Sequence, residues 1–138
     1  MLQGLWTIGI KVADLEQELA FHRGLGNPVV LDETVFIGQE AYRLPLVRMG
    51  DKYLHLAEKM VYERFLDKPL PLGIVHLVYR SDEFVGDLKR SLECGATMIG
   101  EVALISAGFG ERNVAFLRSP SGWVFEIIEV LKNLVPTV

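Results

Sequence analysis

An internal repeat is the feature that most constrains how this chain of 138 residues can fold. A run rich in β-forming residues, Leu5 to Val12, is followed by Asp14, a good helix N-cap, and then by apolar residues at helical spacing up to Gly26. The same order returns at Gly73 to Arg80, where a strand-like run precedes an apolar helical stripe that stops at Gly95. Both halves are therefore expected to begin with a strand and then a helix.

Strand-like runs separated by turn residues follow each expected helix, and the second helix is expected to take Ser81 or Asp82 as its N-cap. These runs are residues 28–31, 42–49 and 52–58 in the first half, and 97–105, 113–117 and 123–130 in the second. The repeat predicts an α+β fold of two tandem βαβββ modules in a single domain of residues 1–138. Module one is residues 1–58 and module two is residues 73–138, with residues 59–72 as the connector.

Composition excludes several classes of function. The formal net charge is -4 and no block of basic residues is present, so a nucleic-acid partner is not expected. No apolar run approaches the roughly 20 residues that a membrane span needs. The single cysteine, Cys94, and a start without the order of a secretory signal predict a cytoplasmic protein. The positive mean hydropathy of +0.27 predicts apolar burial between subunits, and hence a homodimer.

Three residues that can bind metal stand in the middle of apolar strand-like runs. His55 lies between Leu54 and Leu56, His76 lies in a similar run, and Glu126 lies between Phe125 and Ile127. Because side chains alternate along a strand, each polar side chain points away from the face that the helix covers. Burying such groups without partners is costly, and one shared divalent metal would satisfy all three.

The segments Leu5 to Gly26, Gly73 to Tyr79 and Ser119 to Glu129 carry a resemblance to a known family. The chain resembles the vicinal oxygen chelate superfamily, which includes glyoxalases, bleomycin-resistance proteins and extradiol dioxygenases. The resemblance implies that the two βαβββ modules form a U-shaped mixed sheet around a cleft.

The resemblance also implies a set of site residues, at four equivalent strand positions: Thr7, His55, His76 and Glu126. Thr7 departs from the family pattern, in which metal-dependent members usually have His or Gln at this position, and its neutral hydroxyl is a weak metal ligand. The implied metal ligands are therefore His55, His76 and Glu126, which suit Fe, Mn, Ni or Zn. Glu126 is also expected to be catalytic, as ligand and proton acceptor, and Thr7 and Tyr53 are expected to contact the substrate.

The implied function is a metal-dependent enzyme that chelates adjacent oxygens of a small organic substrate. Its reaction would be dioxygenase-like, as in an oxidoreductase, or glyoxalase/isomerase-like, as in a lyase or isomerase. The alternative is a metal-free binding or resistance protein that sequesters an aromatic or drug-like ligand in the same cleft, and Thr7 favours that alternative. His22 is expected to pack against the core, and Arg112 either meets an acidic substrate or is a solvated strand end.

Overall fold

The computed structural model describes residues 1–135, which divide into two compact units. The N-terminal unit comprises residues 7–75, and the C-terminal unit comprises residues 1–6 together with residues 76–135. Strand β1 (Leu2–Lys11) contributes its first residues to the C-terminal unit and its remainder, from Thr7 onward, to the N-terminal unit.

The N-terminal unit is one βαβββ module with an added hairpin. Its sheet has the strand order β2-β5-β6-β1, in which β1 and β6 are parallel and the other neighbours are antiparallel. Strands β3 and β4 pair with each other as a separate hairpin. The elements are α1 (Leu15–Gly24), β2 (Val29–Leu31), β3 (Thr34–Ile37), β4 (Glu40–Arg43), β5 (Leu46–Met49), β6 (Lys52–Ala57) and the 3₁₀ turn η1 (Glu63–Phe65).

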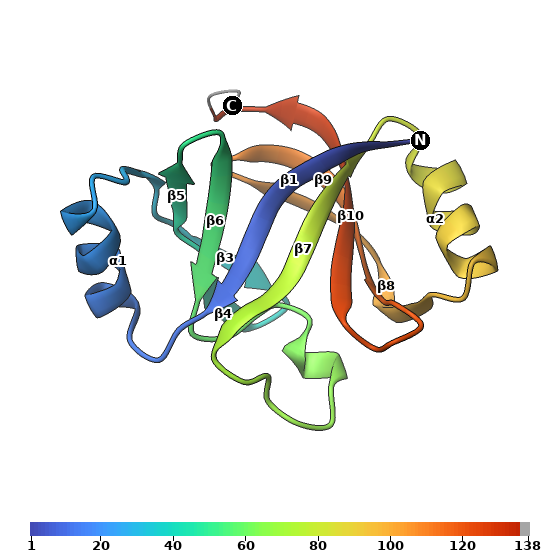
Figure 1. Cartoon of the computed structure of the whole chain (residues 1–138), viewed down its shortest axis with the longest axis horizontal. Coiled ribbons are helices and arrows are strands. Elements are labelled where there is room, and N and C mark those ends of the chain that lie inside the picture. Colours follow the sequence, from blue (N-terminus) through green and yellow to red (C-terminus); the bar gives the residue numbers. More distant parts are fainter. Residues whose placement is uncertain (136–138) are drawn as a thin grey trace. The chain divides into compact units, whose positions relative to one another are not determined.

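Helix α1 begins where the sequence predicts. The Asp14 side chain accepts a hydrogen bond from the Gln17 N–H at 3.1 Å, which satisfies one of the unpaired donors of the first turn. The helix buries Leu15 and Leu19 against Leu54 and Leu56 of β6, on one face of the half-sheet (Figure 1). His22 is also buried on α1, which confirms the expected packing role.

The C-terminal unit repeats the plan. Its strands follow the order β7-β10-β9-β8, with β7 and β10 parallel and the remaining pairs antiparallel. Helix α2 covers one face of this half-sheet and closes a core of Phe84, Ala115, Leu117, Phe125 and Ile127. The elements are β7 (Gly73–Ser81), α2 (Phe84–Glu93), β8 (Thr97–Ala107), β9 (Gly110–Arg118) and β10 (Val124–Asn133).

The α+β class and the two βαβββ modules with mixed strand pairing are confirmed, and two local expectations are wrong. Helix α2 takes Glu83 as its N-cap residue, because the Ser81 hydroxyl donates to Asp87 at 2.5 Å and accepts the Glu83 N–H at 3.0 Å. The expected strand 42–49 is two strands, since Pro45 lacks the N–H that a continuous ladder needs. No helix among residues 1–135 is long and apolar enough to cross a membrane.

Truncating the α1 core should destabilise the protein strongly. Leu19 is fully buried, so Leu19→Ala is expected to lower the free energy of unfolding by about 2–5 kcal/mol, through lost burial and the cavity left behind. Phe21, on the same helix, is 56% exposed, and Phe21→Ala should change it by about 0.5 kcal/mol or less. Urea unfolding measures both, and equal losses in the two variants would contradict the packing described.

Candidate functional site

His76 and Glu126 lie side by side on the C-terminal unit. His76 on β7 is paired in register with Val124 on the parallel strand β10, and Glu126 is paired with Val78. Because register partners in a sheet share a face, the imidazole and the carboxylate project to the same side, opposite the side that α2 covers. The Nε2 atom of His76 lies 3.8 Å from the Oε2 atom of Glu126.

Apolar side chains surround this pair. Phe116 on β9 is the register partner of Glu126, and its ring meets the His76 imidazole edge-on, with centroids 5.8 Å apart. Val78 and Val124 are buried beside them, and Glu126 is only 8% exposed. Removal from water disfavours the ionised carboxylate, so burial raises the pKa of Glu126 to about 8, while the positive charge of Arg112 acts in the opposite direction.

Arg112 is another buried polar residue of this unit, and the sequence did not predict its environment. Its side chain is buried rather than solvated. The guanidinium donates to the carbonyl oxygens of Phe109 at 2.8 Å and Lys132 at 2.5 Å, and to Oδ1 of Asn133 at 3.0 Å. Most of these acceptors are backbone carbonyl oxygens, which every residue has. The sequence therefore offers no acidic partner from which the burial of Arg112 could have been predicted. Burial lowers the pKa of Arg112.

Gly110 is the one sequence signal for this arrangement. Its φ of +114° is a conformation that side-chain-bearing residues rarely adopt. A Cβ at this position would lie 2.0 Å from the same Lys132 carbonyl oxygen that accepts from Arg112. Glycine therefore allows β10 to approach the turn closely enough for Arg112 to bind both segments.

Thr7, Tyr53 and His55 share one face of the N-terminal unit. Thr7 on β1 is the register partner of Tyr53 on β6, and Gly9 is the partner of His55. This face is the one opposite α1, as strand alternation predicts. Thr7 and Tyr53 are buried, and His55 is half-buried. Gly9 leaves no side chain beside the imidazole on β1.

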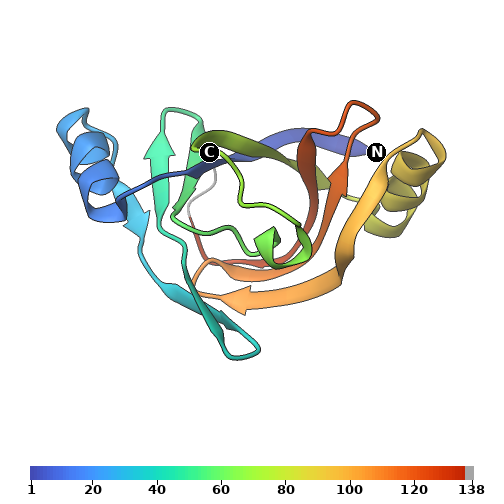
Figure 2. The ribbon, with the colours of Figure 1, turned by 90° about the horizontal axis from the view of Figure 1, so that it is seen from below.

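The connector after β6 packs on this same face. Lys11, two residues beyond Gly9 on β1, donates to the Glu63 carboxylate at 2.9 Å, and both side chains are only 10% exposed. Met60 and Tyr62 of the connector are buried. Figure 2 shows η1 and α1 on opposite sides of β6. The ion pair therefore holds the connector over the strand face that carries Thr7 and His55.

The expected ligand set is divided between the two units. His76 and Glu126 belong to the C-terminal unit, whereas Thr7 and His55 belong to the N-terminal unit. Within either unit, residues 1–135 contain no group of three His, Cys, Asp or Glu side chains that could hold a metal. The His76–Glu126 pair fits part of such a site. Ligand bonds of about 2.0–2.2 Å place two donors of one ion no more than about 4.4 Å apart, and these lie 3.8 Å apart.

Comparison with known proteins gives structural matches only. No protein-family model matches the chain, and no curated protein matches its sequence significantly. A single-residue variant of methylmalonyl-CoA epimerase from Streptomyces coelicolor, solved with 2-nitronate-propionyl-CoA, is 19% identical with a TM-score of 0.74, over 96% of this chain and 100% of the epimerase chain. A methylmalonyl-CoA epimerase from Mycobacterium tuberculosis is 23% identical with a TM-score of 0.70, over 95% and 90% of the two chains.

A more distant match is a 4-hydroxymandelate synthase mutant from Streptomyces coelicolor. It is 17% identical with a TM-score of 0.59, and the match covers 94% of this chain but only 48% of the synthase. At these identities the matches show the fold alone, and the chain therefore has the fold of these enzymes.

The raised pKa of Glu126 makes stability depend on pH in a defined direction. The folded protein keeps the proton up to about pH 8, whereas the unfolded chain releases it near 4.5. Protons are therefore taken up on folding between these values, and the free energy of unfolding should fall as the pH rises across this window. Glu126→Gln cannot titrate and should lose this contribution.

Urea unfolding in the presence of a chelator, between about pH 5 and pH 8, measures the effect. Glu101→Gln is the matched control, because Glu101 is exposed on β8 and should leave the wild-type pH dependence intact. If Glu126→Gln and wild type lost stability in parallel over this window, the assignment of the raised pKa to Glu126 would be wrong.

Proposed function

We propose that the chain is a metal-dependent enzyme of the vicinal oxygen chelate superfamily, acting on a small organic substrate with adjacent oxygens. The observation that carries the proposal is the buried pair of His76 and Glu126, 3.8 Å apart on one strand face. His55, from the equivalent strand of the other module, is the proposed third ligand. Fe, Mn, Ni and Zn all suit two imidazoles and a carboxylate.

The chemistry of the donors supports a cation at this position. A buried carboxylate with a pKa of about 8 keeps its proton at neutral pH when no metal ion is bound. A divalent ion would replace that proton, and it would act as a Lewis acid on the substrate oxygens. The neutral imidazole of a histidine is a good ligand beside such a carboxylate.

Isomerase-like proton transfer is the reaction that the site favours. Glu126 would serve both as a metal ligand and as the proton acceptor, because a carboxylate next to the metal-bound substrate oxygens can take up the proton that the substrate releases. Phe116 and Val78 would exclude water from the carboxylate during the transfer. The match to the epimerases extends over nearly the whole of both chains, whereas the match to the synthase covers half of it, which supports the isomerase-like reading over the dioxygenase-like one.

The proposed substrate contacts come from the N-terminal unit. Thr7 and Tyr53 are register partners on adjacent strands, so their hydroxyl-bearing side chains leave the sheet on the same side as His55. Either hydroxyl can donate a hydrogen bond to a substrate oxygen. Their assignment as substrate-binding residues is part of the proposal.

A second candidate is a metal-free binding protein that holds an aromatic or drug-like ligand. It is favoured by Thr7, which has a neutral, buried hydroxyl at a position where a metal-binding side chain is expected. Under this alternative, His55→Ala and Glu126→Ala would leave ligand affinity nearly intact. The enzyme proposal requires both substitutions to abolish turnover.

Metal uptake tests the proposal. Protein purified without chelator should contain about one equivalent of Fe, Mn, Ni or Zn by elemental analysis, or bind one on titration. His76→Ala should weaken binding by more than about 100-fold, because changes to groups that only support a ligand already cost about 10–100-fold.

The control is His22→Ala, which removes a buried histidine of α1 that is not a proposed ligand. This variant should bind metal like the wild type. Folded protein that takes up none of the four metals, or equal loss of binding in both histidine variants, would overturn the proposal.

A further inference from the structure

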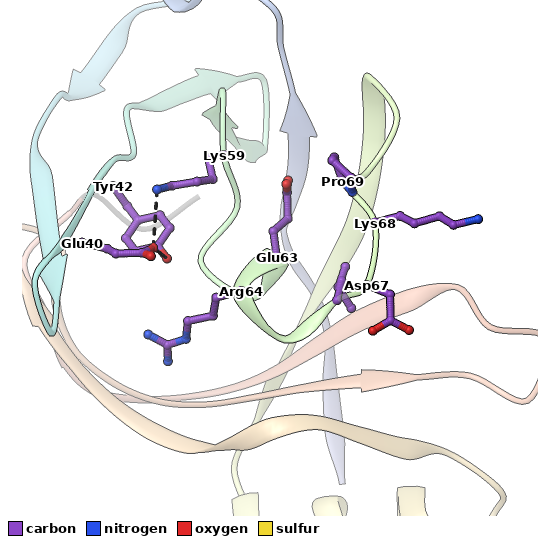
Figure 3. Close-up of a pocket in the computed structure, with 9 residues that line it drawn as sticks. Glu40, Tyr42, Lys59, Glu63, Arg64, Asp67, Lys68 and Pro69 are labelled. Atoms are coloured by element: carbon purple, nitrogen blue, oxygen red, sulfur yellow. Dashed lines mark hydrogen bonds and ion pairs between the residues drawn. The ribbon is translucent and has the colours of Figure 1, made fainter.

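The N-terminal unit contains a pocket of about 260 Å³ between β4 and the connector (Figure 3). This volume is close to the lower end of the range for small-molecule sites. None of the proposed metal ligands lines it. The lining residues are Glu40, Tyr42, Lys59, Glu63, Arg64, Leu66, Asp67, Lys68 and Pro69.

Two of the acidic side chains that line the pocket already have intramolecular donors. Glu40 accepts the Tyr42 hydroxyl at 2.5 Å and the Lys59 ammonium at 3.4 Å. Glu63 accepts Lys11 at 2.9 Å and the backbone N–H of Met60 at 3.2 Å. Their negative charges are therefore balanced within the unit.

Arg64 differs from these residues because its side chain is not in a direct ion pair with a carboxylate, although its positive charge helps to lower the pKa of Glu40. Among residues 1–135 it forms no ion pair or hydrogen bond, and its guanidinium stacks on the Phe65 ring at 4.6 Å. A stacked guanidinium keeps its N–H edge available for a planar, two-pronged contact. In Figure 3, Arg64 extends toward the side of Glu40 and Tyr42, whereas Lys68 extends the opposite way.

Tyr42 gives the pocket an apolar wall next to these cations. Burial and the hydrogen bond to Glu40 raise the pKa of Tyr42 to about 12, so its phenol stays neutral. Lys59 lies over the Tyr42 ring, with its ammonium 4.6 Å from the centroid, and retains donors beyond the one directed at Glu40. Leu66 and Pro69 add further apolar surface.

We propose that this pocket binds a small organic anion through Arg64, with a carboxylate or phosphate group received by the guanidinium fork. Lys59 supplies a second donor, and the apolar part of the ligand lies against Tyr42 and Leu66. Arginine suits this role because its N–H groups match the oxygens of both anions pairwise. The site does not depend on the metal, because it contains neither His55, His76 nor Glu126.

Titration followed by amide NMR shifts tests the site, with butyrate and inorganic phosphate as the charged probes and butyramide as the neutral one. Shifts on binding are expected at β4 and the connector for butyrate, phosphate or both, and the stronger probe identifies the preferred group. Arg64→Gln should weaken the binding of that probe at least about tenfold, as expected for the loss of hydrogen bonds to a charged group. Arg64→Lys, which keeps the charge but lacks the fork, should recover only part of the affinity.

Arg23→Gln is the matched control, because Arg23 is an exposed cation of the same unit outside the pocket. It should bind both probes like the wild type, and His76→Ala should do the same even if its metal binding is lost. The proposal is overturned if butyramide shifts the same amides as butyrate with equal affinity, if neither anion shifts them, or if Arg23→Gln and Arg64→Gln weaken binding equally.

Discussion

Parallel pairing between the first and last strands of each module is the constraint on which the rest of the structure depends. Strands β1 and β6 pair in parallel in the N-terminal unit, and β7 and β10 pair in parallel in the C-terminal unit. Parallel neighbours need a long crossover, which each module supplies as a helix followed by antiparallel strands. The same pairing places Thr7 beside Tyr53 and His76 beside Val124, so residues distant in the chain share one face.

The C-terminal unit shows how a buried acid is tolerated on such a face. Glu126 is enclosed by Phe116 and two valines. In this apolar environment the protonated form of its carboxyl group is more stable than the ionised form. Arg112 contributes a positive charge to the same unit, but its hydrogen bonds go to backbone carbonyl oxygens and to Asn133. These bonds hold the end of β10 against the turn between β8 and β9. The carboxylate is thus left available for a cation or a transferable proton.

The sequence predicted the parts of the fold that rest on periodicity. The strand-helix order of both halves, the Asp14 cap, and the placing of His76 and Glu126 on the face away from α2 follow from alternation and helical spacing. Strand β3 and the start of β4 were not predicted, because the hairpin around Gly38 is short, and the end of β4 was joined to β5 across Pro45. The burial of Arg112 depends on distant backbone carbonyl groups, and the pocket around Arg64 depends on how the connector folds back over the sheet. No local sequence pattern encodes either arrangement. Dimerisation, cytoplasmic location, the single-domain assignment and the full ligand set stay predictions.

The proposed enzyme binds one divalent ion through His76 and Glu126, with His55 as the proposed third ligand. The most direct measurement is anomalous diffraction from crystals grown with zinc. We expect a single strong peak about 2.0–2.2 Å from Nε2 of His76 and from a carboxylate oxygen of Glu126, with a His55 nitrogen as a further ligand. A peak bound elsewhere on the chain, or an empty site between His76 and Glu126 at saturating zinc, would contradict it.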